Sequence, residues 1–411
     1  MKPRTSPFTA LQFRDFRLLW IGMLISRIGT EMQVVAINWQ TYLLTSSALS
    51  LGLIGLSRFL PVLFVSPISG VAADKFDRKK IMFVATLGLT IVSLFLTLCS
   101  FTHHVSPLLI YIVIALQSFF MVFDTPARQS IVPLLVPKKN VIHAVSINTI
   151  MWQSSILLGP ALGGFIIAYF GVSTVYLLNT ISYIAVLIAI LFMGEVKQEK
   201  ITDASFSLNT VKEGLSFVKN TPIIYSSMLL DFFATFFSSA TVLLPIFAKD
   251  ILHVGPQGLG FLYAAPAIGA VVAGLFFSSL GHVKKQGKIV IVAVCLYGLG
   301  TILFGLSRSF WLSLFFLSFI GAGDMISSII RNTMRQLATP DSLRGRMIST
   351  NMIFFMGGPQ LGEAEAGFLA FVVGGPVSVV IGGVATIVAA LSIGYFVPKL
   401  RNYQGHDSLN S

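Results

Sequence analysis

The sequence predicts an all-α polytopic membrane protein that crosses the bilayer twelve times, as two pseudo-symmetric bundles of six helices. Composition is the first observation: 55% of the 411 residues are apolar, 11% are charged, and the mean hydropathy is +0.84. Soluble domains carry about 25% charged residues. The other two observations are long apolar windows and an asymmetric distribution of Lys and Arg.

The apolar windows set the number of crossings. Each half of the chain contains windows of roughly 18–25 residues, the length that a helix needs to cross about 30 Å of hydrocarbon. They are continuous rather than alternating, so they predict helices and not a β-barrel. The expected spans are 17–43, 49–73, 80–100, 107–130, 142–170, 172–193, 223–248, 256–280, 287–306, 310–333, 346–373 and 375–397.

The cations set the expected orientation. With these spans, 24 of the 28 Lys and Arg residues fall on one side of the membrane, and only Lys249 and Arg308 fall on the other. The 24 include Arg331 and Arg335, at the end of the tenth span. By the positive-inside rule, both termini are expected in the cytoplasm. The net charge of +12 thus follows from topology, and nucleic-acid binding is not expected.

One polar insertion divides the chain. Its residues Leu208, Val211, Leu215 and Val218 share one helical face, which predicts an amphipathic helix on the cytoplasmic membrane surface. A solvated linker is the alternative. The expected organisation is an N-terminal segment 1–16, a first bundle 17–193, the linker 194–222, a second bundle 223–397 and a cytoplasmic tail 398–411.

An internal repeat supports two related bundles. The landmarks Arg128-Gln129, Pro137, Gly159-Pro160 and Gly163 recur in the same order as Arg335-Gln336, Pro340, Gly358-Pro359 and Gly362. Two parallel bundles with a substrate site between them, near the middle of the membrane, is the architecture of many secondary transporters.

The loop after the second span carries a family signature. It reads Gly70-Val-Ala-Ala-Asp74-Lys-Phe-Asp77-Arg78-Lys-Lys and resembles the signature loop of the major facilitator superfamily, with Asp77 where the family has a second glycine. The resemblance implies a conformational latch that includes Gly70, Asp74 and Arg78, and we expect Asp124 and Arg128 of the fourth span to take part. A basic loop that only sets topology is the alternative.

The fifth span carries a second signature, Ser155-Ile-Leu-Leu-Gly159-Pro160-Ala-Leu-Gly163-Gly164. It resembles a motif of proton-driven exporters in the same superfamily, with Ser155 in place of the first glycine. The proline is expected to bend the helix, and the glycines allow close helix packing. The motif indicates either a seal against proton leakage or only a packing surface.

A narrower resemblance covers the chain from Phe8 to about Arg401. The segments Phe123–Gln129, Leu135–Pro137, Thr339–Arg346 and Gly358–Gly367 are similar to a bacterial branch that contains enterobactin exporters and transmembrane secretion effectors. The resemblance implies efflux of a small molecule. It also implies a location in a bacterial inner membrane, but it does not identify the substrate.

Ionisable and polar residues inside the spans are candidate site residues, because charge at membrane depth is costly unless it is paired or hydrated. The candidates for a proton-coupling or substrate cavity are Arg27, Glu31, Asn38, Arg58, Asp231, Thr235 and Glu363.

We expect Glu31 to be the proton-coupling carboxylate, with Asp231 as the second candidate. Arg27 and Arg58 would be counter-charges or anchors for an anionic substrate. A permanent Arg27–Glu31 pair that only fixes helix packing is the alternative, and a structural role is the alternative for Asp124 and Asp324.

No cofactor or metal is expected. Cys99 and Cys295 both fall inside apolar spans, which argues against a disulfide or a metal site. The first apolar stretch contains Arg27 and Glu31 and lacks a small-residue cleavage site, so a retained helix is expected.

The leading functional prediction is a proton-coupled exporter of a small amphipathic molecule, such as a siderophore or drug, that works by alternating access. Its expected partners are the substrate, protons and membrane lipid, and it is expected to be a monomer. An importer on the same fold is the first alternative. A non-transporting membrane receptor or assembly partner is the second. An enzyme is not expected, because the sequence shows no nucleophile–base, metal-ligand or phosphate-loop pattern.

Overall fold

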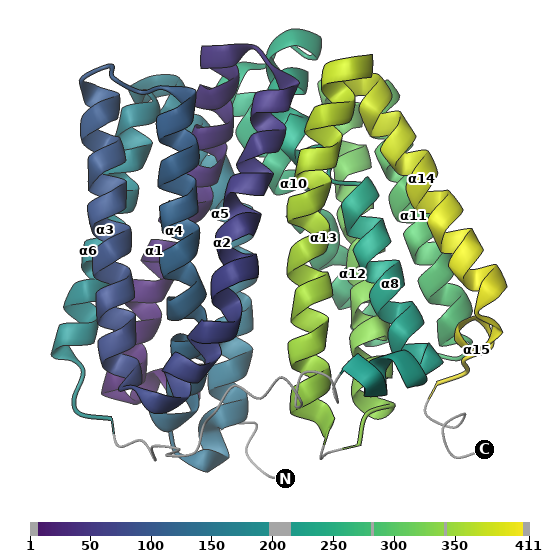
Figure 1. The fold of residues 1–411 in the computed structure, drawn as a ribbon, viewed down its shortest axis with the longest axis horizontal. Coiled ribbons are helices and arrows are strands. Elements are labelled where there is room, and N and C mark those ends of the chain that lie inside the picture. The colour runs from purple at the N-terminus through teal and green to yellow at the C-terminus, as the bar shows by residue number, and fades with distance from the viewer. Residues whose placement is uncertain (1–6, 197–214, 281–282, 341–342, 406–411) are drawn as a thin grey trace. The chain divides into compact units, whose positions relative to one another are not determined.

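The computed structural model describes residues 7–196, 215–280, 283–340 and 343–405, which are almost wholly helical (Figure 1). The long helices are α1 (Arg14–Thr45), α2 (Ala48–Lys75), α3 (Arg78–Phe101), α4 (Pro107–Ile131), α5 (Val141–Phe170), α6 (Val172–Phe192), α8 (Pro222–Phe237), α10 (Gly255–Ser279), α11 (Gln286–Leu306), α12 (Phe310–Leu337), α13 (Arg344–Val373) and α14 (Gly375–Phe396). Short helices include α9 (Leu244–Ile246) and α15 (Pro398–Arg401).

The long helices agree with the predicted spans to within a few residues at most ends. Among the described residues, eleven helical segments are long and apolar enough to cross a membrane. The remaining predicted span, 346–373, coincides with α13, which has 30 residues. Gln360, Glu363 and Glu365 make the middle of α13 less apolar than the other helices.

One predicted span is interrupted. The sequence predicts a continuous helix over 223–248, but α8 ends at Phe237 and is followed by a 3₁₀ turn, α9 and a π turn that ends at Ile251. The Ser239 hydroxyl donates to the Thr235 carbonyl (2.6 Å) and lies 3.2 Å from the Pro359 carbonyl. Pro245 has no N–H to donate to the preceding turn. These side chains account for the interruption.

The helices form two compact units. Unit 1 consists of Met1–Leu44 and Leu60–Phe206, and unit 2 of Thr45–Phe59 and Ser207–Ser411. The helix α2 is therefore divided: its first residues pack within unit 2, although the predicted first bundle contains the whole helix. Gly52 explains this packing, because its Cα lies directly against Gly367 of α13.

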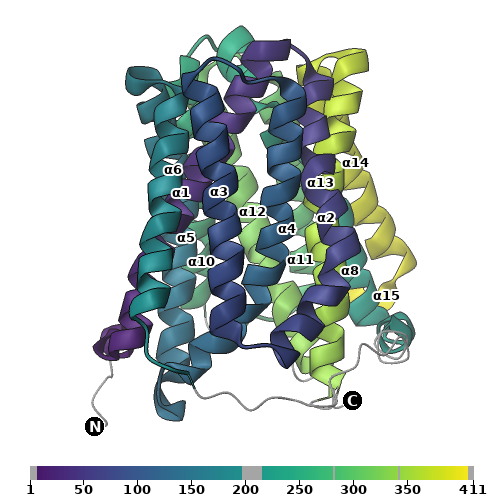
Figure 2. The ribbon, with the colours of Figure 1, turned by 60° about the vertical axis from the view of Figure 1, so that its left-hand side comes forward.

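In unit 1, α3 packs against both α4 and α6 (Figures 1 and 2). The N-terminus of α3 is capped by Asp77, whose carboxylate accepts from the backbone N–H groups of Lys79 and Lys80. Asp77 thus stabilises the helix start at the position where the family signature has glycine. An apolar cluster fills the unit and consists of Leu19, Met82, Ala127, Ile131, Val186, Ile190 and Met193.

In unit 2, α12 packs against α10 and α11, and α11 packs against α14. The α10–α12 contact brings backbones together: Gly321 of α12 faces the carbonyl of Pro266, and Gly269 of α10 faces the carbonyl of Ser318. A second apolar cluster consists of Leu230, Ala234, Val290, Val294, Ile330, Met334, Ala390, Leu400 and Tyr403. It joins α8, α11, α12 and α14 to α15.

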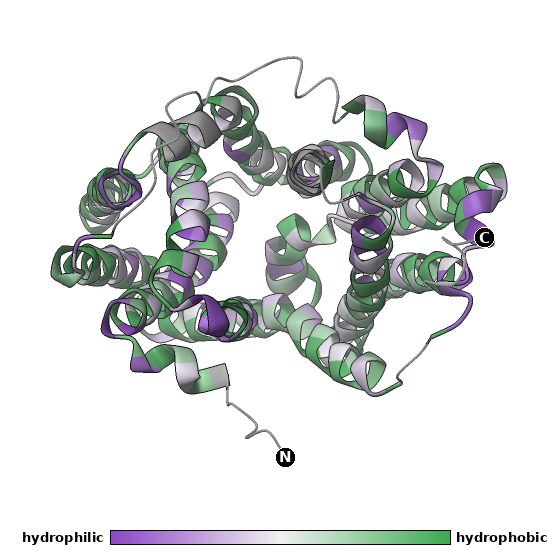
Figure 3. Cartoon of the chain, turned by 90° about the horizontal axis from the view of Figure 1, so that it is seen from below, coloured by the Kyte–Doolittle hydropathy of each residue, from purple (hydrophilic) through white to green (hydrophobic). Residues whose placement is uncertain are grey.

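Large apolar side chains also cover the outside of the helices. Phe64 and Leu275 are each 71% exposed, and Figure 3 shows that hydrophobic residues predominate along the helices. Such surfaces are expected to face lipid.

Part of the predicted linker helix can be placed. Leu208 and Val211 lie outside the described residues. Residues 215–220 are helical, and Val218 is buried in a cluster with Ile224, Met228 and Met347, whereas Leu215 is half exposed. Val218 is therefore covered by protein, whereas Leu215 on the same predicted face is not.

Substitution at the α10–α12 contact tests its importance. Gly321→Ala would place a Cβ against the Pro266 carbonyl, and we expect it to lower stability by about 1–3 kcal/mol, the usual cost of overpacking. Thermal unfolding of the purified protein in detergent measures this. Gly357→Ala is the matched control, since the nearest atoms lie 3.7 and 3.9 Å from the added Cβ. Equal destabilisation by the two changes would contradict the assignment.

Candidate functional site

Arg27 and Glu31 form an ion pair one turn apart on α1. Arg27 Nη2 lies 3.1 Å from Glu31 Oε1, and their side chains are 20% and 18% exposed. The Arg27 guanidinium also stacks on Trp152 of α5, 3.6 Å from the ring centroid. Cation–π attraction and the carboxylate thus fix Arg27 from two sides. Trp152 is 48% exposed, so this cluster is accessible from outside unit 1.

The predicted exporter-type motif forms the contact between α5 and α1. A Cβ at Gly159 would collide with the Cβ of Glu31, and one at Gly163 would lie 3.0 Å from the Cα of Met32. Pro160 and Gly164 are also buried, and α5 remains helical through the proline. The motif therefore packs the α5 backbone directly against Glu31.

A buried network of uncharged polar groups lies beside this cluster. The Gln33 side chain bonds to Gln117 (3.0 Å) and Asn179, and it accepts from the Ser93 hydroxyl at 3.4 Å. Asn38, a predicted site residue, is buried on the same helix. The network was not predicted from the sequence, because uncharged Gln, Asn and Ser in different apolar spans give no charge signal.

The residues predicted to form the latch are only partly placed. Gly70 and Asp74 fall outside the part of the chain whose side chains are described. Arg78 Nη1 donates to the Ser130 carbonyl (3.2 Å), which joins α3 to the end of α4. Arg128 pairs with Asp124 one turn before it on α4, and its Nη2 lies 3.2 Å from the Thr86 hydroxyl of α3.

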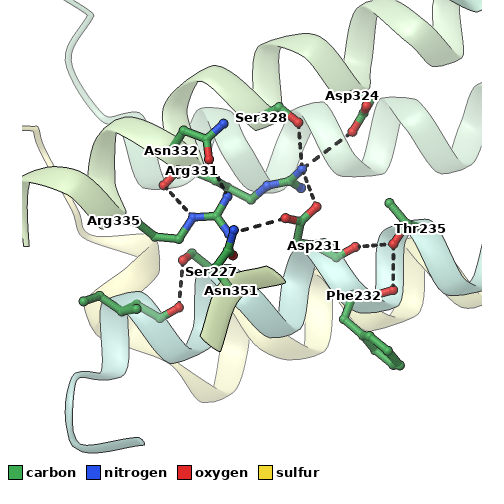
Figure 4. A network of polar contacts seen from close by, with 11 residues as sticks. Ser227, Asp231, Phe232, Thr235, Asp324, Ser328, Arg331, Asn332, Arg335 and Asn351 are labelled. Carbon is green, nitrogen blue, oxygen red and sulfur yellow. Dashed lines mark hydrogen bonds and ion pairs between the residues drawn. The ribbon is translucent and has the colours of Figure 1, made fainter. Parts of the chain in front are cut away.

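Unit 2 contains a denser ionic cluster between α8 and α12 (Figure 4). Asp231 of α8 lies 2.8 Å from Arg331 Nη2 and 3.4 Å from Arg335 Nη1. The side chains of both arginines and of Asp231 are at most 6% exposed. Asp324 of α12 lies 3.6 Å from the same Nη2 atom of Arg331, but its side chain is 47% exposed.

Arg335 has further partners. Its guanidinium donates to Asn332 on α12 (2.9 Å) and to Asn351 on α13, so three helices meet at this residue. Arg331 has the Ser328 hydroxyl at 3.1 Å. We call Asp231, Asp324, Arg331 and Arg335 the Asp231 cluster.

Arg331 and Arg335, which the sequence places at the cytoplasmic end of the tenth span, are both buried and both contact Asp231. Their pairing with Asp231 was not predicted. A signal was available: Asp324, Arg331 and Arg335 follow at intervals of seven and four residues, which places them on one face of α12.

Thr235 lies one turn after Asp231, and its hydroxyl donates to the Asp231 carbonyl (2.9 Å). A Cβ at Gly358 would collide with that hydroxyl, so α13 packs on α8 through its glycines, much as α5 packs on α1. Phe232 and Phe236 stack on the same helix with centroids 5.7 Å apart.

Arg58 and Glu363 join α2 to α13 within unit 2. Arg58 Nη1 lies 3.4 Å from both carboxylate oxygens of Glu363, and the two side chains are 21% and 16% exposed. A Cβ at Gly55 would lie 3.2 Å from Glu363 Oε2 and would collide with the Gln360 carbonyl. The pair therefore sits at a close contact between two backbones.

The predicted residues thus fall into separate clusters. Arg27 and Glu31 come together with the fifth-helix glycines, Asp231 comes together with Thr235, and Arg58 with Glu363. Within the described ranges, no group of three or more His, Cys, Asp or Glu side chains could hold a metal ion.

Buried ion pairs set in apolar helices are characteristic of proteins that move solutes across membranes. The profile of a family described as transmembrane secretion effector matches residues 5–411. The chain belongs to this family, a branch of the major facilitator superfamily of transporters, and is a multi-pass integral membrane protein rather than an enzyme.

The chain is also similar to named transporters of the same superfamily. The chain is 26% identical over 395 residues to the enterobactin exporter EntS of Citrobacter koseri, which covers 95% of this chain and 93% of EntS. It is 32% identical over 216 residues to the MFS-type transporter YfiS of Bacillus subtilis, about half of each protein. The fold matches that of a D-xylose-proton symporter with a TM-score of 0.72 and 15% identity, over 97% of this chain and 100% of the symporter.

The Asp231 cluster is expected to contribute to the folding stability of unit 2. Asp231→Asn leaves two buried arginines without their shared carboxylate, and breaking a buried pair in this way costs about 3–5 kcal/mol. We expect little monodisperse protein by size-exclusion chromatography and a lower unfolding temperature. Adding Arg331→Gln to Asp231→Asn should restore part of the loss, because one unpaired charge is removed. Asp250→Asn, at an exposed carboxylate of the same unit, is the control. A stable single variant at Asp231 would refute the prediction.

Proposed function

We propose that this protein is a proton-coupled exporter of a small amphipathic molecule, that it resides in a bacterial inner membrane with both termini in the cytoplasm, and that it acts as a monomer by alternating access. The observation that supports export is the similarity to EntS over nearly the whole length of both chains. Because that relative is an enterobactin exporter, enterobactin is the first compound to test.

Glu31 is the proposed proton-coupling residue of unit 1. Its carboxylate is partly exposed, it has Arg27 as a counter-charge, and the backbone of α5 at Gly159 packs against its Cβ. A carboxylate in such a setting can bind a proton when water reaches it and can release its hold on the arginine when it is neutral. Since α1 and α5 are in contact at this point, a change in the Arg27–Glu31 pair alters the packing of both helices.

Arg27 and Trp152 are the proposed substrate contacts beside Glu31. A guanidinium stacked on an indole gives a flat surface with hydrogen-bond donors at its edge. Such a surface suits an amphipathic molecule that has both a flat apolar part and a polar group. The predicted latch of Gly70, Asp74, Arg78, Asp124 and Arg128 remains part of the proposal, as do the bundle boundaries at 193 and 223.

Transport by inside-out vesicles with an acidic lumen tests direction and coupling together. Enterobactin and other amphipathic compounds are added outside, where the cytoplasmic face is exposed. Accumulation that stops when the pH gradient is collapsed supports proton-coupled export. Accumulation in vesicles of the opposite orientation would favour the importer, and binding without movement in either orientation would favour a receptor.

A Glu31 variant tests the coupling residue. Glu31→Gln keeps the size of the side chain but cannot exchange a proton, so gradient-driven accumulation should fall to the level of vesicles that lack the protein. Exchange of labelled for unlabelled substrate without a gradient should continue. Glu195→Gln, at an exposed glutamate just after α6, is the matched control. Unchanged gradient-driven transport in the Glu31 variant would exclude the assignment.

A further inference from the structure

Asp231 and Asp324 have very different surroundings, although both contact Arg331. Asp231 is held at 2.8 Å by Arg331 and at 3.4 Å by Arg335, and its side chain is 6% exposed. Both arginines are themselves buried, so the Asp231 carboxylate is enclosed by its two cationic partners. Asp231, the second proton-coupling candidate from the sequence, therefore has little direct contact with solvent.

Asp324 is held more weakly and is more open. Its distance to Arg331 Nη2 is 3.6 Å, Ser328 is a further hydrogen-bond partner, and 47% of its side chain is exposed. The residue is halfway along α12, where an ionised group cannot face hydrocarbon cheaply. Its exposed side is therefore expected to face water rather than hydrocarbon, and water can supply and accept a proton.

Arg331 connects the two carboxylates through a single atom. The same Nη2 contacts Asp231 on α8 and Asp324 on its own helix. In the described part of the chain, Arg331 Nε and Nη1 are buried and have no hydrogen-bond partner. A buried guanidinium with incomplete bonding is free to strengthen one carboxylate contact at the expense of the other.

The charges of the Asp231 cluster give the consequence of proton binding. With both carboxylates ionised, the two arginines are neutralised. When Asp324 takes a proton from water, one positive charge is left over, and Arg331 retains Asp231 as its only charged partner in the cluster. In surroundings of low dielectric this concentrates the attraction on the contact between α12 and α8.

We propose that Asp324 is the proton-exchanging residue of unit 2 and that Arg331 transmits its protonation state to Asp231, so that proton binding tightens the contact between α8 and α12. This inference rests on the proposed proton coupling. The groups that face Asp324 are Arg331 on α12, Asp231 on α8 and Tyr297 on α11, whose backbone packs against Gly323. The neighbouring helix α10 contains no Asp, Glu, Lys, Arg or His.

Infrared spectroscopy of the purified protein tests proton binding without any substrate. The C=O stretching band of protonated carboxyl groups is followed as pH is varied. We expect one titrating component of the wild-type band to be lost in Asp324→Asn and retained in Asp250→Asn. Asp324→Glu keeps a carboxyl group but moves it by one methylene, so its titration midpoint should shift. A wild-type titration that is unchanged in both Asp324 variants would overturn the proposal.

Hydrogen exchange tests the transmission to α8. Amide exchange over 222–237 is measured by mass spectrometry at low and high pH and corrected for the intrinsic pH dependence. The wild-type segment should exchange more slowly at low pH. In Asp324→Asn, which mimics the neutral acid, the segment should exchange slowly at both pH values. If the protection of these amides still depends on pH in this variant, the role of Arg331 is overturned.

Both measurements are independent of transport. A protein that fails to export any compound but shows the infrared and exchange behaviour above would refute the proposed function and leave this inference standing. If proton-driven export and the infrared titration are both unaffected in Asp324→Asn, the inference about Asp324 is refuted and the proposed function stands.

Discussion

Neutralisation of charge inside apolar helices is the constraint that organises this protein. Hydrocarbon offers no solvation, so an ionised side chain at membrane depth needs a partner on a neighbouring turn or a neighbouring helix. Arg27 pairs with Glu31 within α1, whereas Asp231 draws Arg331 and Arg335 from another helix. Pairs of the first kind fix a side chain, and pairs of the second kind fix two helices to each other.

Close backbone contacts bring these pairs into place. Glycines of α5 press on α1 beside Glu31, and glycines of α13 press on α8 next to Thr235 and on α2 near Glu363. In a membrane, where apolar surfaces gain little by leaving lipid, small residues that allow tight van der Waals packing supply much of the attraction between helices. The repeated Gly-Pro segments therefore have a packing role in both units, whatever further part they play in transport.

The helices could be predicted from the sequence because apolar length is a local property. Residues whose role depends on a distant partner could not. Arg331 and Arg335 are at a cytoplasm-facing helix end when read along the chain, and their partner Asp231 precedes Arg331 by 100 residues. Gln33 and Asn179 carry no charge, and so the network they form was missed. The break after Phe237 depends on Ser239 reaching a carbonyl of α13. The Arg27–Glu31 pair was foreseen since both residues share one helix face.

The division of α2 has a mechanical consequence. The helix α2 has residues in both compact units, so any shift between the units during a transport cycle would bend this helix. Pro61 follows the point of division at Phe59 and Leu60, and its ring nitrogen has no proton to offer the carbonyl of Ser57. Bending of α2 is therefore least costly at this proline, which lies where the helix passes from one unit into the other.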